Sequence, residues 1–197
     1  PKEVPGILAR WGILSSRVVY FEKTRAGAFK AASSYSKRAL VTVTTHDHAP
    51  VRGFVAGRDL ELRRAVGVLQ DDDALAHAKE ARQREVEALK RRLRASGCLP
   101  EADAPAAAAT LTPALHRFLR QTPAPLAGLS LDDLAGEVEP VNVPGVSPED
   151  HPSWTRRMGL TVESMAERPE VREAFANEGT PLQLHRHRLR QRRKTAG

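Results

Sequence analysis

The stretch of sequence that decides the fold is Ala39-Leu40-Val41-Thr42-Val43-Thr44-Thr45-His46-Asp47. Its valines and threonines are β-branched, and residues of this kind favour a strand. Ala49-Pro50 follows, and the strand must end before it because proline cannot donate to a ladder of backbone hydrogen bonds. Catalytic side chains often stand at the carboxyl ends of buried parallel strands. His46 and Asp47 therefore form the first candidate site.

Helix and strand patterns alternate around this stretch. Apolar spacing and capping residues predict helices over 3–11, 52–66, 72–95, 112–120, 162–167 and 170–177, and further strands over 17–22 and 125–131. The strongest helix is 72–95, because acidic residues precede it and basic residues end it, as the helix dipole favours. Thr112-Pro113 supplies an N-cap and a first-turn proline for the next helix.

The alternation of strands and helices is typical of a parallel sheet covered by helices. The sequence supplies about three good strands, whereas a closed α/β barrel needs eight. The prediction is therefore an α/β fold that forms an incomplete part of a barrel. We expect this part to occupy residues 1–180 and a separate basic tail to occupy residues 181–197.

The net charge of +7 is concentrated in that tail. Six arginines and lysines lie between Arg186 and Lys194 without an acidic residue among them, so the rest of the chain is nearly neutral. Such a cluster can contact phosphates. It contains no aromatic residue that could stack on a base. We therefore expect a solvated tail and no nucleic-acid partner.

The cysteine count and the lengths of the apolar runs indicate the compartment and the relation of the chain to membranes. Cys98 is the single cysteine, so no internal disulfide can form, and a reducing compartment such as the cytoplasm is expected. No apolar run approaches the roughly 20 residues that span a bilayer. No membrane association is expected.

The run His46-Asp47-His48 allows three interpretations. If the strand continues through His48, the two histidines share one face and can bind a metal, although a metal site needs three or four ligands and none has suitable spacing nearby. In the second interpretation, Asp47 is held beside His46 and acts on a substrate that develops positive charge. In the third, these polar side chains merely satisfy a strand end. No metal and no cofactor are expected.

Three other positions carry side chains of possible functional value. Asn142, in the loop Val141-Asn142-Val143-Pro144-Gly145, can donate to and accept from the hydroxyls of a ligand, or serve an ordinary turn. Trp154 is either a sugar-stacking platform or a surface anchor. Tyr20-Phe21-Glu22 stands at a strand end like His46-Asp47, and either lines the same cleft or belongs to the core.

Several motifs in order resemble the amylomaltase or disproportionating-enzyme family, the 4-α-glucanotransferases, in its C-terminal part. The matching residues are Ile13 to Glu22, Thr44-Thr45-His46-Asp47, Gly57-Arg58-Asp59-Leu60-Glu61-Leu62, Glu139 to Gly145, and His151-Pro152-Ser153-Trp154-Thr155-Arg156-Arg157. Together they extend over most of the chain.

This resemblance implies a (β/α)8 barrel enzyme that works by a retaining double displacement. Such an enzyme cuts an α-1,4-glucan or maltooligosaccharide and passes the bound segment to the 4-hydroxyl of another sugar. Asp47 matches the family's transition-state stabiliser, His46 matches a residue that binds the same sugar ring, and Asn142 matches an asparagine that lines the site.

The sequence departs from the family's pattern in two ways. His48-Ala49-Pro50 stands where Leu-Pro is usual, and Ser153 and Thr155 replace a usual asparagine and arginine. The nucleophilic aspartate and the acid/base glutamate of the family belong upstream of Pro1, so we expect this chain alone to be inactive. The alternative is a noncatalytic module that binds carbohydrate or nucleic acid.

Overall fold

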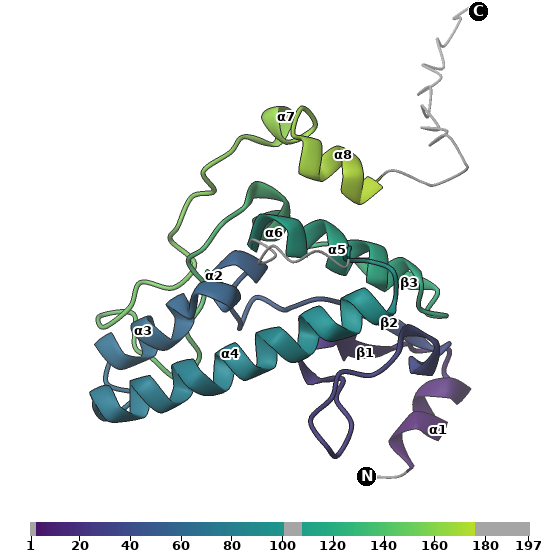
Figure 1. Cartoon of the computed structure of the whole chain (residues 1–197), viewed down its shortest axis with the longest axis horizontal. Helices are drawn as coiled ribbons and strands as arrows, with labels where there is room; N and C mark the ends of the chain where they lie inside the picture. Colours follow the sequence, from purple (N-terminus) through teal and green to yellow (C-terminus); the bar gives the residue numbers. More distant parts are fainter. Residues whose placement is uncertain (1–2, 101–107, 176–197) are drawn as a thin grey trace, which may run out of the picture.

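The structure is a computed structural model that describes residues 3–100 and 108–175 (Figure 1). The basic tail predicted over 181–197 and its boundary with the rest of the chain lie outside these residues. In the part of the chain that is described, no helix is long and apolar enough to cross a membrane.

The centre of the fold is a parallel sheet of three strands. These are β1 (Ser15–Val18), β2 (Ala39–Thr42) and β3 (Leu126–Gly128), arranged in the order β1-β2-β3. Val41 of β2 lies opposite Arg17 on one side and Ala127 on the other. The predicted α/β class and the parallel arrangement are confirmed.

All three strands are shorter than the sequence predicts. The ladder ends where Thr42 lies opposite Val18 and Gly128. Beyond Val18 the chain turns into a 3₁₀ helix over Val19–Phe21, so the prediction of a strand over 17–22 is wrong in its second half. The strand that was predicted to reach Asp47 likewise ends at Thr42, the last of its residues that pairs with β1 and β3.

Eight α-helices are present in the described residues, besides the 3₁₀ helix over Val19–Phe21 and a second one over Ala32–Ser34. They are α1 (Val4–Arg10), α2 (Val51–Ala56), α3 (Arg58–Ala65), α4 (Asp72–Ala95), α5 (Ala108–Arg120), α6 (Leu131–Ala135), α7 (Val162–Met165) and α8 (Pro169–Phe175). The bounds of α4 are those predicted, and Asp71 caps it by accepting a hydrogen bond from the backbone N–H of Ala74 at 2.7 Å. The helix predicted over 52–66 is divided at Gly57, whose φ of 73° is left-handed.

Helix α5 begins at Ala108, so its predicted start at Thr112 is wrong. Pro113 lies inside the helix and removes one hydrogen bond near the N-terminus. The face that α5 buries compensates for this loss, because Leu111, Leu115 and Phe118 are almost fully inaccessible. Packing therefore outweighs the local preference of proline for the first turn.

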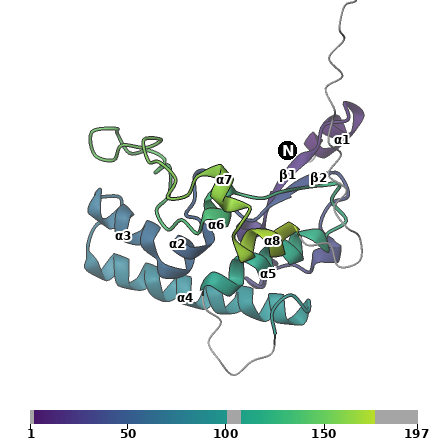
Figure 2. The ribbon, with the colours of Figure 1, turned by 90° about the horizontal axis from the view of Figure 1, so that it is seen from above.

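Two clusters of apolar side chains form the core. The larger one joins the sheet to α2, α4 and α5, and the smaller one joins α6 to α7 and α8. Figures 1 and 2 show that the segment between α6 and α7 runs out toward the end of the molecule where α3 lies. This segment contains Asn142 and Trp154, and it brings them toward the loop that follows β2.

Candidate functional site

The loop after β2 is a tight turn organised by Thr45. The hydroxyl of Thr45 accepts a hydrogen bond from the backbone N–H of Asp47 at 3.3 Å and lies 2.8 Å from Nδ1 of His48. The backbone N–H of His48 donates to the Thr45 carbonyl at 3.2 Å. This turn leaves the side chains of His46 and Asp47 accessible at the carboxyl end of the strand.

The structure brings the three predicted site residues together. Nδ2 of Asn142 donates a hydrogen bond to Oδ1 of Asp47 at 2.7 Å, and Nε2 of His46 lies 3.3 Å from the same oxygen. Asp47 follows β2, whereas Asn142 lies in the segment that follows β3 and α6. Sequence reasoning selected these residues, and the fold places them in one cluster.

The loop around Asn142 is tied to the residues near Trp154. The backbone N–H of Trp154 donates to the Val141 carbonyl at 2.8 Å, and the backbone N–H of Val143 donates to Oγ of Ser153 at 3.2 Å. Ser153, one of the departures from the family pattern, is therefore able to hold this loop. The indole ring of Trp154 lies 5.2 Å from the His46 ring, measured between centroids.

Two hollows meet at this cluster. The first has a volume of about 360 Å³, and Thr45, His46, Ser130, Asp132 and Trp154 are among its lining residues. The second has a volume of about 320 Å³ and is lined in part by Asp47, Asp59, Arg63 and Asn142. His48 lines both. The turn that carries His46 and Asp47 thus separates two spaces that can hold a ligand.

A metal site at His46 and His48 would require the strand to continue through His48, and it does not. Because β2 ends at Thr42, the two histidines do not share a strand face. Nδ1 of His48 lies against the Thr45 hydroxyl, and burial lowers the pKa of His48, opposed by the charge of Asp47. Across residues 3–100 and 108–175, no group of three or more His, Cys, Asp or Glu side chains could hold a metal ion.

Of the residues Tyr20, Phe21 and Glu22, two belong to the interior and one lies beside the candidate site. Tyr20 is buried and stacks on Phe54, with ring centroids 4.1 Å apart. Glu22 is buried and pairs with Lys30 at 2.7 Å. Phe21 alone of the three approaches the candidate site, where its ring meets the His48 ring edge-on at 5.0 Å.

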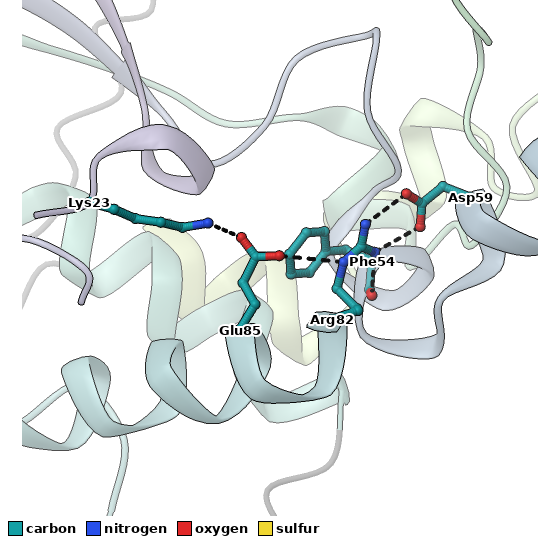
Figure 3. Close-up of polar contacts among 5 residues, drawn as sticks. All are labelled: Lys23, Phe54, Asp59, Arg82 and Glu85. Atoms are coloured by element: carbon teal, nitrogen blue, oxygen red, sulfur yellow. Dashed lines mark hydrogen bonds and ion pairs between the residues drawn. The ribbon is translucent and has the colours of Figure 1, made fainter. Parts of the chain in front are cut away.

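Sequence reasoning missed an ion-pair network that supports the second hollow (Figure 3). Arg82 on α4 forms two hydrogen bonds of 2.8 Å with the Asp59 carboxylate, and its guanidinium lies 3.8 Å from the centroid of the Phe54 ring. Glu85 lies 3.6 Å from Arg82 and also contacts Lys23. The network fixes α2 and α3 against α4. No local signal links Asp59 to Arg82, since the two are joined only by tertiary packing.

A buried carboxyl on α6 was also missed. Asp133 is 4% exposed, and its Oδ1 accepts a hydrogen bond from the backbone N–H of Val51 at 2.6 Å. Burial raises the pKa of Asp133 to about 7. Since α2 begins at Val51, directly after the turn that carries His46 and Asp47, Asp133 holds the far end of that turn. The one sequence feature that could have pointed to Asp133 is its position in the pair Asp132-Asp133 directly after a predicted strand.

Comparison with known proteins identifies relatives for most of the chain. The family model described as 4-alpha-glucanotransferase matches residues 1–161. The 4-alpha-glucanotransferase of Mycobacterium tuberculosis is 32% identical over 157 residues, which are 76% of this chain and 20% of that protein. The 4-alpha-glucanotransferase of Haemophilus influenzae is 31% identical over 163 residues, which are 80% of this chain and 23% of that protein.

Solved structures agree with these relatives. The crystal structure of amylomaltase from Corynebacterium glutamicum matches with a TM-score of 0.78 and 28% identity, covering 88% of this chain and 26% of that one. Amylomaltase from Streptococcus agalactiae in complex with acarbose matches in fold with a TM-score of 0.53 and 15% identity, covering 88% of this chain and 29% of that one. The chain spans about 20% of the length of its mycobacterial relative. It belongs to the 4-alpha-glucanotransferase family.

Proposed function

We propose that this chain forms part of an enzyme that transfers segments of α-1,4-glucans to the 4-hydroxyl of another sugar by a retaining double displacement. The observation that carries the proposal is the contact of Asn142 with Asp47, beside His46, at the carboxyl end of β2. The substrates are α-1,4-glucans and maltooligosaccharides, and no cofactor takes part.

The fold proposed for the working enzyme is a (β/α)8 barrel to which this chain contributes consecutive strands. The parallel order β1-β2-β3 supports this, because neighbouring strands of such a barrel are consecutive in the sequence. Asp47 follows β2, and Asn142 follows β3 after α6. Residues at the carboxyl ends of different strands thus contribute to one site, as is usual in these barrels.

Asp47 acts as the transition-state stabiliser in this proposal. Within the described part of the chain, the polar contacts of its carboxylate involve Oδ1, which Asn142 and His46 approach. Oδ2 is then available to a sugar hydroxyl or to the positive charge that develops on the sugar ring as the glycosidic bond breaks. His46 and Asn142 orient the carboxylate and bind the same sugar.

A retaining mechanism needs two further carboxylates, a nucleophile and an acid/base. The other carboxylates that line the two hollows are Asp59 and Asp132, and they are paired with Arg82 and Arg156 at 2.8 Å. Pairing with an arginine keeps each carboxylate ionised, so neither Asp59 nor Asp132 suits the acid/base, which must give up a proton to the leaving group. We therefore expect the chain by itself to bind maltooligosaccharides without turning them over. A reducing compartment such as the cytoplasm fits Cys98, the single cysteine of the sequence, whose side chain is buried.

The test compares two ligands on the purified chain. Acarbose carries an amine that is positively charged when protonated, whereas maltotetraose is neutral. Asp47→Asn should weaken acarbose binding by about tenfold to a hundredfold, the range of a charge-assisted hydrogen bond, and maltotetraose binding by about threefold. Asp150→Asn is the control, because Asp150 is an exposed aspartate in the segment after α6 that accepts a hydrogen bond from the Ser147 hydroxyl at 2.9 Å.

Isothermal titration calorimetry gives both affinities. An equal loss for the two ligands would contradict the transition-state role and favour the noncatalytic carbohydrate-binding alternative. Measured release of glucose from maltotriose by the chain alone would contradict the expected inactivity.

A further inference from the structure

Trp154 has a backbone conformation that its side chain does not favour. Across the described ranges 3–100 and 108–175 it is the single residue other than glycine with a positive φ, at 66°. A bulky side chain is unfavourable there because its Cβ approaches the following carbonyl oxygen. The side chain is also 61% exposed, so its burial does not compensate. Strain of this kind tends to persist at functional sites.

The neighbouring residues hold Trp154 in this conformation. Its backbone N–H donates to the Val141 carbonyl at 2.8 Å, and the Thr155 hydroxyl donates to the Pro152 carbonyl at 2.6 Å. The Arg156 guanidinium pairs with Asp132 at 2.8 Å and with Glu137 at 2.9 Å. Both ends of the turn are therefore fixed.

The ring forms one side of the 360 Å³ hollow, next to His46. Its centroid lies 5.2 Å from that of His46, at an interplanar angle of 47°, so the two rings are tilted and do not stack face to face. The polar residues Thr45, Ser130 and Asp132 also line the hollow. Its volume lies in the range of about 300–1,000 Å³ that is usual for small-molecule sites.

An aromatic residue beside polar residues matches the two sides of a glucopyranose ring, one apolar and one rich in hydroxyls. We propose that Trp154 is a stacking platform that binds one glucose unit of an α-1,4-glucan in this hollow. The inference rests on the proposed function, because it assigns a sugar-binding subsite next to Asp47. The subsite depends on Trp154 and the 360 Å³ hollow, whereas the proposed function depends on Asp47, so an experiment can contradict either one alone.

The first experiment uses tryptophan fluorescence, since the chain has two tryptophans. Trp11 is 74% exposed and directly follows α1 as its C-cap, so it is a matched control. In the Trp11→Phe variant, titration with maltoheptaose should shift or quench the emission of Trp154. In the Trp154→Phe variant, the emission of Trp11 should not change. Unchanged Trp154 emission at saturating sugar would overturn the platform.

The second experiment separates the ring from the turn that carries it. Glycine tolerates a positive φ, so Trp154→Gly should keep or raise the midpoint of thermal unfolding. It should also lower the affinity for maltoheptaose by about tenfold, the size of effect that a central aromatic contact has. Trp154→Phe keeps an aromatic face and should restore part of the affinity. A surface anchor would show the reverse: a lower unfolding midpoint and unchanged affinity for Trp154→Gly.

The outcomes distinguish this inference from the proposed function. If Asp47→Asn discriminates between acarbose and maltotetraose while Trp154→Gly leaves both affinities unchanged, the platform is wrong and the proposed function stands. If Trp154→Gly weakens both ligands while Asp47→Asn weakens them equally, the platform stands and the role of Asp47 does not. Absence of binding by the unmodified chain to both sugars overturns both.

Discussion

Asn142 directs its side-chain N–H at Oδ1 of Asp47 from a position 95 residues further along the chain. The contact joins the loop after β2 to the segment after α6. It also occupies Oδ1 of Asp47, whereas Oδ2 is available to a ligand. This relationship predicts that the two residues act as a unit.

A double-mutant cycle tests that unit. Asn142→Ala should weaken acarbose binding, because Asp47 loses the donor that orients it. In the presence of Asp47→Asn, the same substitution should have little further effect, giving a coupling energy of about 0.5–3 kcal/mol. Calorimetric titration of the four proteins measures it. Simple additivity of the two substitutions would mean that Asn142 does not act through Asp47.

The buried carboxyl of Asp133 predicts a pH dependence of stability. Its pKa rises from 3.8 to about 7 in the folded chain, so between these values the folded state holds a proton that the unfolded state has lost. Its contribution is fully present below about pH 4 and decreases as the pH rises to about 7. At about 1.36 kcal/mol per pKa unit, the total change is up to about 4 kcal/mol.

Asp133→Asn removes this proton uptake and keeps an oxygen that can accept from Val51. The variant should therefore gain stability over the unmodified chain as the pH rises from about 4 to about 7. Denaturant unfolding at several pH values measures the difference between the two proteins. The comparison of the two proteins is needed because burial also lowers the pKa of His116 to about 4. The contribution of His116 to stability therefore increases as the pH rises, opposite to that of Asp133. A difference that does not vary with pH would contradict the prediction.

The pair Arg82–Asp59 predicts a large loss of stability on removal of one partner. Both side chains are mostly buried, at 13% and 18% exposed. Arg82→Ala leaves the Asp59 carboxylate without its partner and should cost about 3–5 kcal/mol. Combining it with Asp59→Leu should restore part of this loss, since no buried charge remains.

Arg84 provides the matched control for Arg82. It lies on the same helix and pairs with Glu80 at 3.8 Å, with both side chains more than half exposed. Arg84→Ala should change the free energy of unfolding by less than about 1 kcal/mol. Equal losses for Arg82→Ala and Arg84→Ala would contradict the supporting role of the network.

Substitution by alanine should have opposite effects at two glycines. A Cβ at Gly53 on α2 would collide with the backbone carbonyl of Val138, whereas a Cβ at Gly6 on α1 meets open space. Gly53→Ala should therefore be strongly destabilising, and Gly6→Ala should stabilise the chain by about 0.4–1 kcal/mol. Thermal unfolding of both variants checks the contrast. Tolerance of alanine at position 53 would contradict the close packing of α2 against this segment.

The features that the sequence predicts well are the local ones. The bounds of α4 follow from Asp71 as its cap, an apolar stripe and Gly97 after its end, all within one stretch. The end of β2 depends instead on where its neighbours β1 and β3 stop pairing, which no local pattern records. The start of α5 was misjudged for the same reason, because tertiary packing outweighed the preference of Pro113.

The candidate site divides in the same way. His46, Asp47 and Asn142 were selected from motifs, and Trp154 was left between two interpretations. The contacts of Asp133 with Val51 and of Arg82 with Asp59 connect residues 82 and 23 positions apart. A single sequence contains no signal for such pairs, so the support beneath the site could not be predicted.

The two ion pairs of Arg156 have a consequence for how this segment can change in length. They fasten the turn at Trp154 to Asp132 on α6 and to Glu137 just after it, and the Asn142 loop is fastened to the same turn. Residues 144–150 between these points are largely exposed, and the bonds of Ser147 with Asp150 are local. Because both ends of residues 144–150 are fastened and the residues between them are exposed, we expect a change in the length of this stretch to leave the positions of Asn142 and Trp154 unaltered.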